Sequence, residues 1–436
     1  MRGEFSRRYG ELYPGKRCRT VTFIVTHQCN LRCSYCYETG KSDERMSLET
    51  AKRCVDLLFT EDDRGSEYLG PETHDGIILD FIGGEPLLEI DLISETVDYF
   101  RKRAMELRHR WAVRYMISMS SNGVLYHDER VRRFLMRNQG RVSMGITLDG
   151  DKETHDSCRV GCDGCGSYDL AAAAFSDAKA RFGCDGTKFT VAPQNVHRVY
   201  GACRDMIERF DLAELHLNCV YEEGWDEPLA GEWYRQLKAL ADWLMESGRH
   251  ERTTLSVFDP YIGKPLPAED KQNWCGGTGQ MLAFDVDGTI YPCLRYAPLS
   301  IPNRPPLRIG DVESGIGVLE EDRERIAMLT AITRQSQSRE ECLGCPIASG
   351  CGWCSAYNYQ VHGTPDRRCT YICPTHKARV MAASYYHNRL FTEKGVGQPF
   401  PLNIPREWAV PIVGEEEVAA LQALAERAGR EERNHE

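Results

Sequence analysis

A chain of 436 residues with 42% hydrophobic residues is long enough for two or three domains with a sizeable buried core. Its formal net charge of -11 disfavours nonspecific binding to nucleic acid or to an anionic membrane. The first 20 residues lack the apolar stretch of a signal peptide, and no window approaches the roughly 20 apolar residues of a membrane span. We therefore expect a cytoplasmic protein whose 19 cysteines are thiols or metal ligands rather than disulfides.

From residue 21 to about 250 the sequence alternates short β-branched apolar runs with longer stretches of helical period. The predicted strands are Val21–Thr26, Ile77–Phe81, Tyr115–Ser120, Val142–Leu148, Lys188–Val191 and Glu214–Asn218. The predicted helices span 47–59, 91–107, 128–137, 168–181, 198–209 and 231–246. Six such units predict an α/β fold with a partial (βα)6, TIM-like barrel over 21–250, open on one side, after an N-terminal extension over 1–20.

After residue 250 the sequence becomes rich in Gly, Pro and Cys, and its hydrophobic residues show little periodicity. We expect a second domain over 251–390, with clustered cysteines between 275 and 373 and a helix near 374–390. A segment with so few apolar runs is expected to be held together by metal rather than by a hydrophobic core. A tail over 391–436 contains a last predicted helix from Glu415.

Three cysteines, Cys29, Cys33 and Cys36, follow the first predicted strand in the run HQCNLRCSYCYE. This loop lies at the carboxyl end of a barrel strand, where barrel enzymes place their chemistry. Three thiolates can hold three irons of a cubane and leave the fourth iron open to a small molecule. A zinc site is the alternative, and it would need a fourth ligand to close it.

The CxxxCxxC spacing resembles the signature of the radical S-adenosylmethionine (SAM) superfamily, and FIGGEP at 81–86 resembles its GGEP motif. The resemblance implies that the three cysteines are catalytic, hold a 4Fe-4S cluster and leave one iron to chelate SAM. It implies SAM contacts from Tyr35, Gly83, Gly84, Glu85, Ser120, Asn122, Thr147 and Arg159. Glycines and small polar residues at strand ends are also ordinary turn formers, which is the alternative for these positions.

The later cysteines resemble the SPASM extension of radical SAM enzymes, which carries two auxiliary 4Fe-4S clusters. The resemblance implies an outer cluster on Cys342, Cys345, Cys351 and Cys373, and an inner cluster on Cys275, Cys293 and Cys354. Seven cysteines for two cubanes leave one inner iron open, and a substrate thiolate could bind it. Cys369 is an alternative to Cys373, and the short gap before Cys354 leaves its role open. Zinc ribbons are the alternative for the region as a whole.

A second CxxxCxxC run is formed by Cys158, Cys162 and Cys165. It follows no apolar strand and has Gly164 where the first run has an aromatic residue. We interpret the repeated spacing as coincidental, with another metal or redox site as the alternative.

Several segments resemble the radical SAM/SPASM peptide maturases whose targets carry Cys-xxx repeats, the ranthipeptide group. Among them are FIGGEPLLEIDLI, NWCGGTGQMLAFDVDGTIYPC and CPIASGCGWCSAYNYQ. The resemblance implies a thioether-forming maturase that acts on a cysteine-rich, ribosomally synthesised peptide and takes electrons from a low-potential donor such as ferredoxin or flavodoxin. Leu294 follows Cys293 where sulfatase maturases carry a catalytic Asp, which argues against that activity.

Other products are open to the same radical chemistry, because the position that reacts depends on how the substrate is held. The alternatives are carbon-carbon crosslinks and epimerised residues. An iron-sulfur electron carrier or a zinc-binding protein without catalysis is the alternative of another class. The 28 residues before Cys29 are too few for a leader-recognition domain, so we expect leader binding elsewhere.

Overall fold

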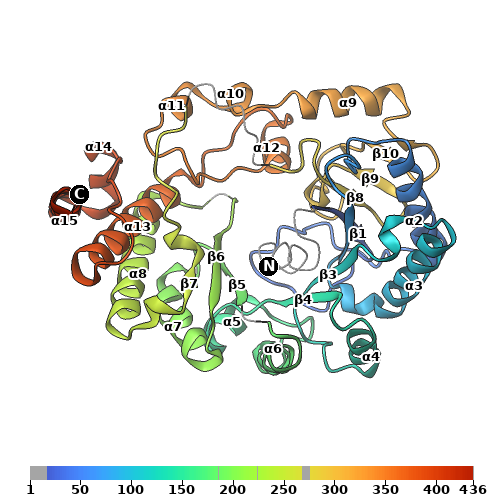
Figure 1. Ribbon diagram of the computed structural model, residues 1–436, viewed down its shortest axis with the longest axis horizontal. Helices are drawn as coiled ribbons and strands as arrows, with labels where there is room; N and C mark the ends of the chain where they lie inside the picture. Colours follow the sequence, from blue (N-terminus) through green and yellow to red (C-terminus); the bar gives the residue numbers. More distant parts are fainter. Residues whose placement is uncertain (1–16, 185, 223, 268–274, 436) are drawn as a thin grey trace.

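The computed structural model describes residues 17–184, 186–222, 224–267 and 275–435, and its elements are labelled in Figure 1. Six parallel strands alternate with helices in the first half of the chain. The strands are β1 (Cys18–Ile24), β2 (Gly76–Ile82), β3 (Tyr115–Ser121), β4 (Val142–Ile146), β5 (Gly186–Val191) and β6 (Glu214–Cys219). The helices are α2 (Leu48–Asp63), α3 (Ile90–Glu106), α4 (Glu129–Arg137), α5 (Lys152–Cys158), α6 (Tyr168–Phe182), α7 (Val199–Phe210) and α8 (Glu227–Glu246). The six predicted strands and six predicted helices are confirmed, and α5 is an addition to them.

The strands form an α/β partial barrel rather than a closed one. Strands β1 to β4 belong to an eight-stranded sheet in the order β11-β10-β9-β8-β1-β2-β3-β4, whereas β5 and β6 form a separate sheet with β7 (Thr254–Leu255). Side chains bridge the break between the sheets, because Thr187 Oγ1 donates to the Ile146 carbonyl at 2.7 Å and the Thr190 amide donates to Asp149 at 2.9 Å. The predicted partial barrel is therefore correct.

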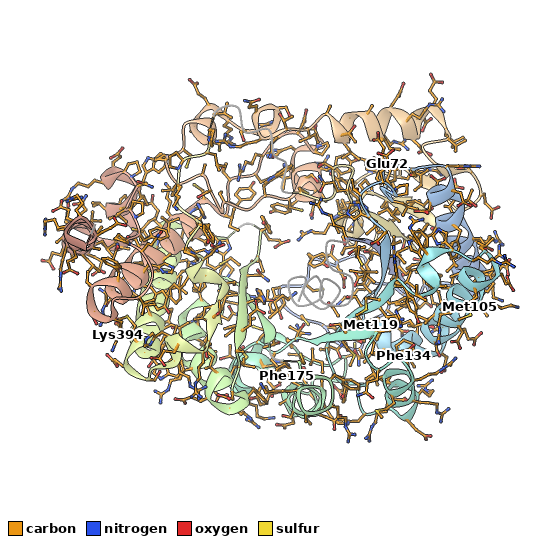
Figure 2. The ribbon with its side chains drawn as sticks, viewed as in Figure 1. Glu72, Met105, Met119, Phe134, Phe175 and Lys394 are labelled. Carbon is orange, nitrogen blue, oxygen red and sulfur yellow. The ribbon has the colours of Figure 1, made fainter. Side chains whose placement is uncertain are left out.

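Strands β1 to β4 are buried on both faces over most of their length, as is usual in parallel sheets, which explains their continuous apolar runs. Strands β5 and β6 instead alternate buried and partly exposed residues. In β1, Val21 and Phe23 are fully buried, and Phe23 packs against Phe81 with ring centroids 5.3 Å apart. Side chains fill the layer between the strands and the surrounding helices in Figure 2, where Phe134 and Phe175 contribute from α4 and α6. The rigid sheet fixes the loops at its carboxyl edge.

The C-terminal half contains short elements joined by long loops. Its strands are β8 (Leu282–Phe284), β9 (Thr289–Tyr291), β10 (Gly310–Asp311) and β11 (Gly315–Ile316). Its helices are α9 (Glu320–Thr330), α10 (Arg334–Gln337), α11 (Glu340–Leu343), α12 (Ser355–His362), α13 (Cys373–Lys394), α14 (Arg406–Val413) and α15 (Glu415–His435). The helices predicted near 374–390 and from Glu415 are confirmed.

Two contacts attach this half to the barrel. Strand β8 pairs in parallel with β1, with Phe23 opposite Phe284, so the hairpin of β8 and β9 extends the barrel sheet. At the other end, α13 packs along α8, and α15 lies beside α13 (Figure 1). Tyr385 of α13 donates to Asp242 of α8 at 2.7 Å. Across the described residues, no helix is long and apolar enough to cross a membrane.

Candidate functional site: cysteine loops at the mouth of the barrel

The loop after β1 carries Cys29, Cys33 and Cys36 and lies against the loop after β2. The Gly84 amide donates to the Thr26 carbonyl at 3.0 Å, and the Glu85 amide donates to the Gln28 carbonyl at 2.9 Å. A Cβ atom on Gly84 would lie 2.4 Å from the Gln28 oxygen and 2.9 Å from the Cys29 Cβ. The glycine pair is therefore required for close packing of these two loops.

The three thiols of this loop are partly buried, and burial raises their pKa values, that of Cys29 to about 12. The positive charge of Lys41 acts on all three, and Lys41 also donates to the Leu31 carbonyl at 3.3 Å. Such thiols stay protonated near neutral pH unless a metal ion stabilises the thiolate. The local environment thus favours metal ligation over free nucleophilic thiols.

Glu85 is fully enclosed at the centre of the site. Its carboxylate accepts bonds from Ser121 Oγ at 2.8 Å, the Asn122 amide at 2.8 Å and the Leu87 amide at 3.1 Å. Burial raises its pKa, and these three donors oppose the rise. The carboxylate therefore ties the loop after β2 to the end of β3.

Ser121, which sequence reasoning missed, is the serine that contacts Glu85, whereas the predicted Ser120 is exposed. The alternation of side chains along β3 separates these neighbours onto opposite faces. Asn122 is buried and donates through Nδ2 to Asn30 Oδ1 at 2.7 Å, so it contacts the cysteine loop directly. Thr147 is also buried, and its amide donates to the Ser121 carbonyl at 3.1 Å.

Tyr35, Arg159 and Asp149 form a buried polar cluster beside the cysteines. Arg159 Nη1 donates to the Tyr35 hydroxyl at 2.8 Å and lies 3.6 Å from Asp149 Oδ2, and the Tyr35 hydroxyl donates to the same carboxylate. Burial raises the pKa of Tyr35 and Asp149 raises it further, so the phenol stays neutral. Arg159 Nε is buried without a hydrogen-bond partner among the described residues, which leaves one donor for a bound ligand.

Two further ionisable residues, Glu38 and Lys188, face the same interior. Burial raises the pKa of Glu38 to about 7, and Lys188 of β5 has a pKa lowered by burial. The charges of Glu38 and Asp149 act on Lys188, which places the lysine close to both carboxylates. Neither residue was singled out from the sequence, because isolated charged residues carry no motif.

The second CxxxCxxC run forms a hairpin that pairs with the first cysteine loop. The Arg32 amide donates to the Val160 carbonyl at 2.8 Å, and the Cys162 amide donates to the Asn30 carbonyl at 3.1 Å. Cys158 is buried while Cys162 and Cys165 are exposed. The three thiols therefore do not face a common point, and the hairpin's visible role is to support the first loop.

Cys275, Cys293 and Cys354 approach one another at the edge of the barrel. A Cβ on Gly277 would lie 3.2 Å from the Cys293 sulfur and 3.6 Å from the Cys275 sulfur. The charges of Cys275 and Cys354 act on Cys293 and help burial to raise its pKa. We call these three residues the inner set.

Arg295 lies between the inner set and the first cysteine loop. It stacks on Tyr37, the residue after Cys36, at 4.4 Å and donates to Glu222 at 2.8 Å. Its charge also acts on Cys354, against the burial that raises the pKa of that thiol. The two cysteine regions are therefore connected through the contact between Tyr37 and Arg295.

Cys342, Cys345, Cys351 and Cys373 form a second group, which we call the outer set. The charges of the other three members act on Cys351, whose thiol pKa is raised to about 11, chiefly by burial. Cys369 instead lies 3.4 Å from His362 Nε2. The structure therefore brings Cys373, rather than Cys369, together with the other three.

The distances between these thiols indicate whether they suit a single zinc ion or a larger cofactor. Sulfur ligands of one zinc ion would lie about 3.8 Å apart, given Zn–S bonds of about 2.3 Å. Within the ranges that the structure describes, the three-residue group with ligand atoms all within 4.8 Å is Asp62, Asp63 and His109. Among the described residues, no set of three cysteines has sulfur atoms that all lie within 4.8 Å of one another. This wider separation fits a multi-iron cluster better than a single zinc ion.

Comparisons with known proteins agree with this geometry. Residues 13–125 match the 4Fe-4S single cluster domain family. The cysteine-type anaerobic sulfatase-maturating enzyme of Clostridium perfringens is 27% identical over 288 residues, which cover 62% of this chain and 72% of the enzyme. The mycofactocin maturase MftC of Mycolicibacterium smegmatis is 27% identical over 358 residues, covering 78% of each protein.

Two solved structures have a similar fold. The enzyme anSMEcpe with bound AdoMet and Kp18Cys peptide aligns with a TM-score of 0.59 at 18% identity, over 84% of this chain and 97% of that enzyme. SuiB of Streptococcus suis, bound to its precursor peptide SuiA, aligns with a TM-score of 0.54 at 14% identity, over 84% of this chain and 80% of SuiB.

The chain shares with these solved structures a partial parallel barrel followed by a C-terminal segment, and its three thiols and its GGEP loop lie at the carboxyl edge of that barrel. The chain is a radical SAM enzyme, and its homologues and structural neighbours are radical SAM maturases of peptides, sulfatases and cofactors.

Proposed function

We propose that this enzyme modifies a cysteine-rich, ribosomally synthesised peptide by joining cysteine sulfur to carbon in thioether crosslinks. The observation that carries the proposal is the inner set, three partly buried thiols that adjoin the first cysteine loop through Tyr37 and Arg295. Three protein thiolates on a cubane leave one coordination position, and a thiolate of the substrate suits it chemically. In this proposal, the sulfur that reacts would lie beside the SAM site.

The residues present fit three 4Fe-4S clusters, one on Cys29, Cys33 and Cys36 and two on the inner and outer sets. When bound, the first cluster supplies the electron that cleaves SAM reductively to a 5'-deoxyadenosyl radical. A low-potential donor such as ferredoxin or flavodoxin would provide that electron. The match of residues 13–125 to the 4Fe-4S single cluster domain family supports the first of these clusters.

The chain's own residues bind and orient SAM in this proposal. Arg159 has a buried, unpaired Nε that would donate to the SAM carboxylate, while Asp149 and Tyr35 hold the guanidinium in place. Gly83 and Gly84 bring backbone close to the cysteines, and Glu85 fixes that loop against β3 for contact with the amino group. Asn122 and Thr147 close the same edge of the barrel.

Relatives with peptide and protein substrates support a macromolecular substrate. The name of one relative states that it matures sulfatases, and SuiB was solved with a precursor peptide. Sulfatase maturation is the second candidate for this chain on that basis. It is disfavoured because Leu294, rather than a carboxylate, follows Cys293, and its neighbour Arg295 is engaged with Tyr37 and Glu222.

SAM cleavage is tested by replacing one cysteine in each CxxxCxxC run. Cys33→Ala is expected to abolish formation of 5'-deoxyadenosine by the reduced, reconstituted enzyme. Cys165→Ala is the control, since its thiol is exposed on the hairpin, whereas the Cys162 sulfur donates to the Cys29 carbonyl at 3.6 Å; this change should leave the product yield unchanged. Persistent deoxyadenosine in Cys33→Ala would contradict the assignment of the SAM cluster.

Crosslinking is tested by coexpression with a peptide that carries Cys-xxx repeats. Mass spectrometry is expected to show the loss of two hydrogen atoms per crosslink, resistant to reductant and blocking thiol alkylation. Cys354→Ala should retain SAM cleavage but lose crosslinking, because the inner set would be incomplete. Unmodified peptide with active SAM cleavage would redirect the proposal to another product or substrate.

A further inference from the structure

Arg368 is a buried arginine in contact with the outer set. It lies in the segment between α12 and α13 and is 9% exposed. Its Nη2 donates to the Cys351 sulfur at 3.1 Å, to the Cys351 carbonyl at 3.3 Å and to the Gly352 carbonyl at 3.2 Å. Its own amide donates to the Gln337 carbonyl at 3.0 Å, which anchors the backbone.

The charge of this guanidinium is not neutralised by a carboxylate. In the portion of the chain that the structure describes, no Asp or Glu forms an ion pair with Arg368, whereas the similarly enclosed Arg295 is paired with Glu222 at 2.8 Å. A buried charge without a counter-charge costs several kcal/mol, so proteins rarely retain one. The missing negative charge must therefore come from the groups that Arg368 does contact.

Those groups are the sulfurs of the outer set. Arg368 Nη2 lies 3.1 Å from the sulfur of Cys351, which belongs to the outer set with Cys342, Cys345 and Cys373. Thiolates on an iron-sulfur cubane carry the negative charge that a buried cation needs. A hydrogen bond to a cluster sulfur and a nearby positive charge are both known to set a cluster's reduction potential.

We infer that Arg368 is the counter-cation and positioning residue of the outer cluster, holding the Cys351–Gly352 backbone and raising the cluster's reduction potential. The inference rests on the outer cluster of the proposed function. The positive charge stabilises the reduced cluster, which carries one more electron, more than it stabilises the oxidised cluster. Removing the charge should therefore lower the midpoint potential.

The test compares Arg368→Gln and Arg368→Lys in a chain that carries Cys29→Ala, Cys33→Ala and Cys36→Ala, so that the signals come from the auxiliary clusters. Iron content and an EPR-monitored redox titration are measured on the reconstituted protein. Arg368→Gln is expected to keep its iron and shift one of the two midpoint potentials downward. Arg368→Lys keeps the charge and should retain most of the original potential.

Arg304→Gln is the matched control, because Arg304 donates to the Gln360 and Val361 carbonyls rather than to a cysteine sulfur among the described residues; this change should leave both potentials unchanged. Unshifted potentials in Arg368→Gln would overturn the inference. So would equal loss of iron from the Gln and Lys variants, which would assign Arg368 to backbone support alone. A parent protein with iron for only one auxiliary cluster would instead contradict the proposed function.

Discussion

At the scale of single residues, the site depends on two glycines, whose lack of a side chain matters as much as the side chains around them. Gly83 and Gly84 allow the loop after β2 to lie on the backbone of the cysteine loop, and a Cβ at either position would approach a carbonyl oxygen to 2.4 Å. Real Cβ atoms do not approach so closely, so the loops would have to separate. The motif that suggests SAM binding therefore also has a packing requirement.

Gly84→Ala should separate the two loops and reduce both stability and cluster loading. Overpacking of this kind costs about 2 kcal/mol, measurable as the free energy of unfolding in urea. Iron content should fall because Cys29 is the neighbour displaced. Gly201→Ala is the control, since its Cβ would meet nothing within 4 Å in α7, and it should be neutral or stabilise by up to about 1 kcal/mol.

Asp149→Asn removes the charge that faces Arg159 and Tyr35. Breaking a buried ion pair costs about 3 kcal/mol, because Arg159 would remain buried and charged. Equilibrium dialysis should also show weaker SAM binding. Asp151→Asn is the control, because Asp151 caps α5 and asparagine caps equally well. Equal stability of the two variants would refute the role of the buried pair.

At the scale of elements, the hairpin of β8 and β9 connects the C-terminal half to the barrel. Strand β8 continues the sheet beside β1, and the turn residue Asp285 accepts a 2.7 Å bond from His27 Nε2 near the cysteine loop. Burial lowers the pKa of His27, but the hydrogen bond and charges of Asp285 and Glu44 outweigh it and raise the value. The barrel edge thus depends on residues more than 250 positions apart.

Asp285→Ala should destabilise the protein by about 3 kcal/mol in urea, because buried His27 loses its partner. The folded pKa of His27 is raised, so the pair's contribution is present at mildly acidic pH and is lost as pH rises through that value. The difference from the parent should shrink at alkaline pH. Asp287→Ala, in the same turn but exposed, should cost no more than about 1 kcal/mol.

At the scale of the whole molecule, the two halves differ in what holds them together. One apolar core runs from the barrel into the C-terminal half, but the segment from Leu294 to Ile372 contributes a small share of it and consists mainly of short helices and strands with long loops. Two cysteine sets lie in or beside this segment, and we propose that their clusters stabilise it. Exposed side chains such as Met105 and Lys394 mark the outer surface of the surrounding helices in Figure 2.

Removal of iron by chelation should therefore loosen the C-terminal segment before the barrel. Limited proteolysis of the iron-free protein is expected to cut first between residues 297 and 372, while the barrel fragment persists. The reconstituted protein should resist cleavage there. Early cuts in the barrel helices of both forms would contradict a stabilising role for the auxiliary clusters.

The sequence by itself determined the six βα units, because parallel strands and their covering helices have distinct hydrophobic periods. It also placed the cysteine loop and the GGE loop at adjacent strand ends. It did not give the break between β4 and β5 or the pairing of β8 with β1, because short strands with distant partners leave no local pattern. Only the tertiary structure distinguishes Ser121 from Ser120, because Ser121 is buried against Glu85 whereas Ser120 is exposed at the end of β3.

For the cysteines too, the sequence determined some properties and the tertiary structure determined others. Their spacing predicted cluster binding, but the sequence left Cys369 as an alternative to Cys373 and repeats CxxxCxxC at Cys158. Folding brings Cys373 to the outer set and leaves Cys162 and Cys165 exposed. Arg295 and Arg368 belong to no sequence motif, and only the tertiary structure shows their contacts with the cysteine sets. Their roles depend on which charges lie near them in space, and the chain order does not record that.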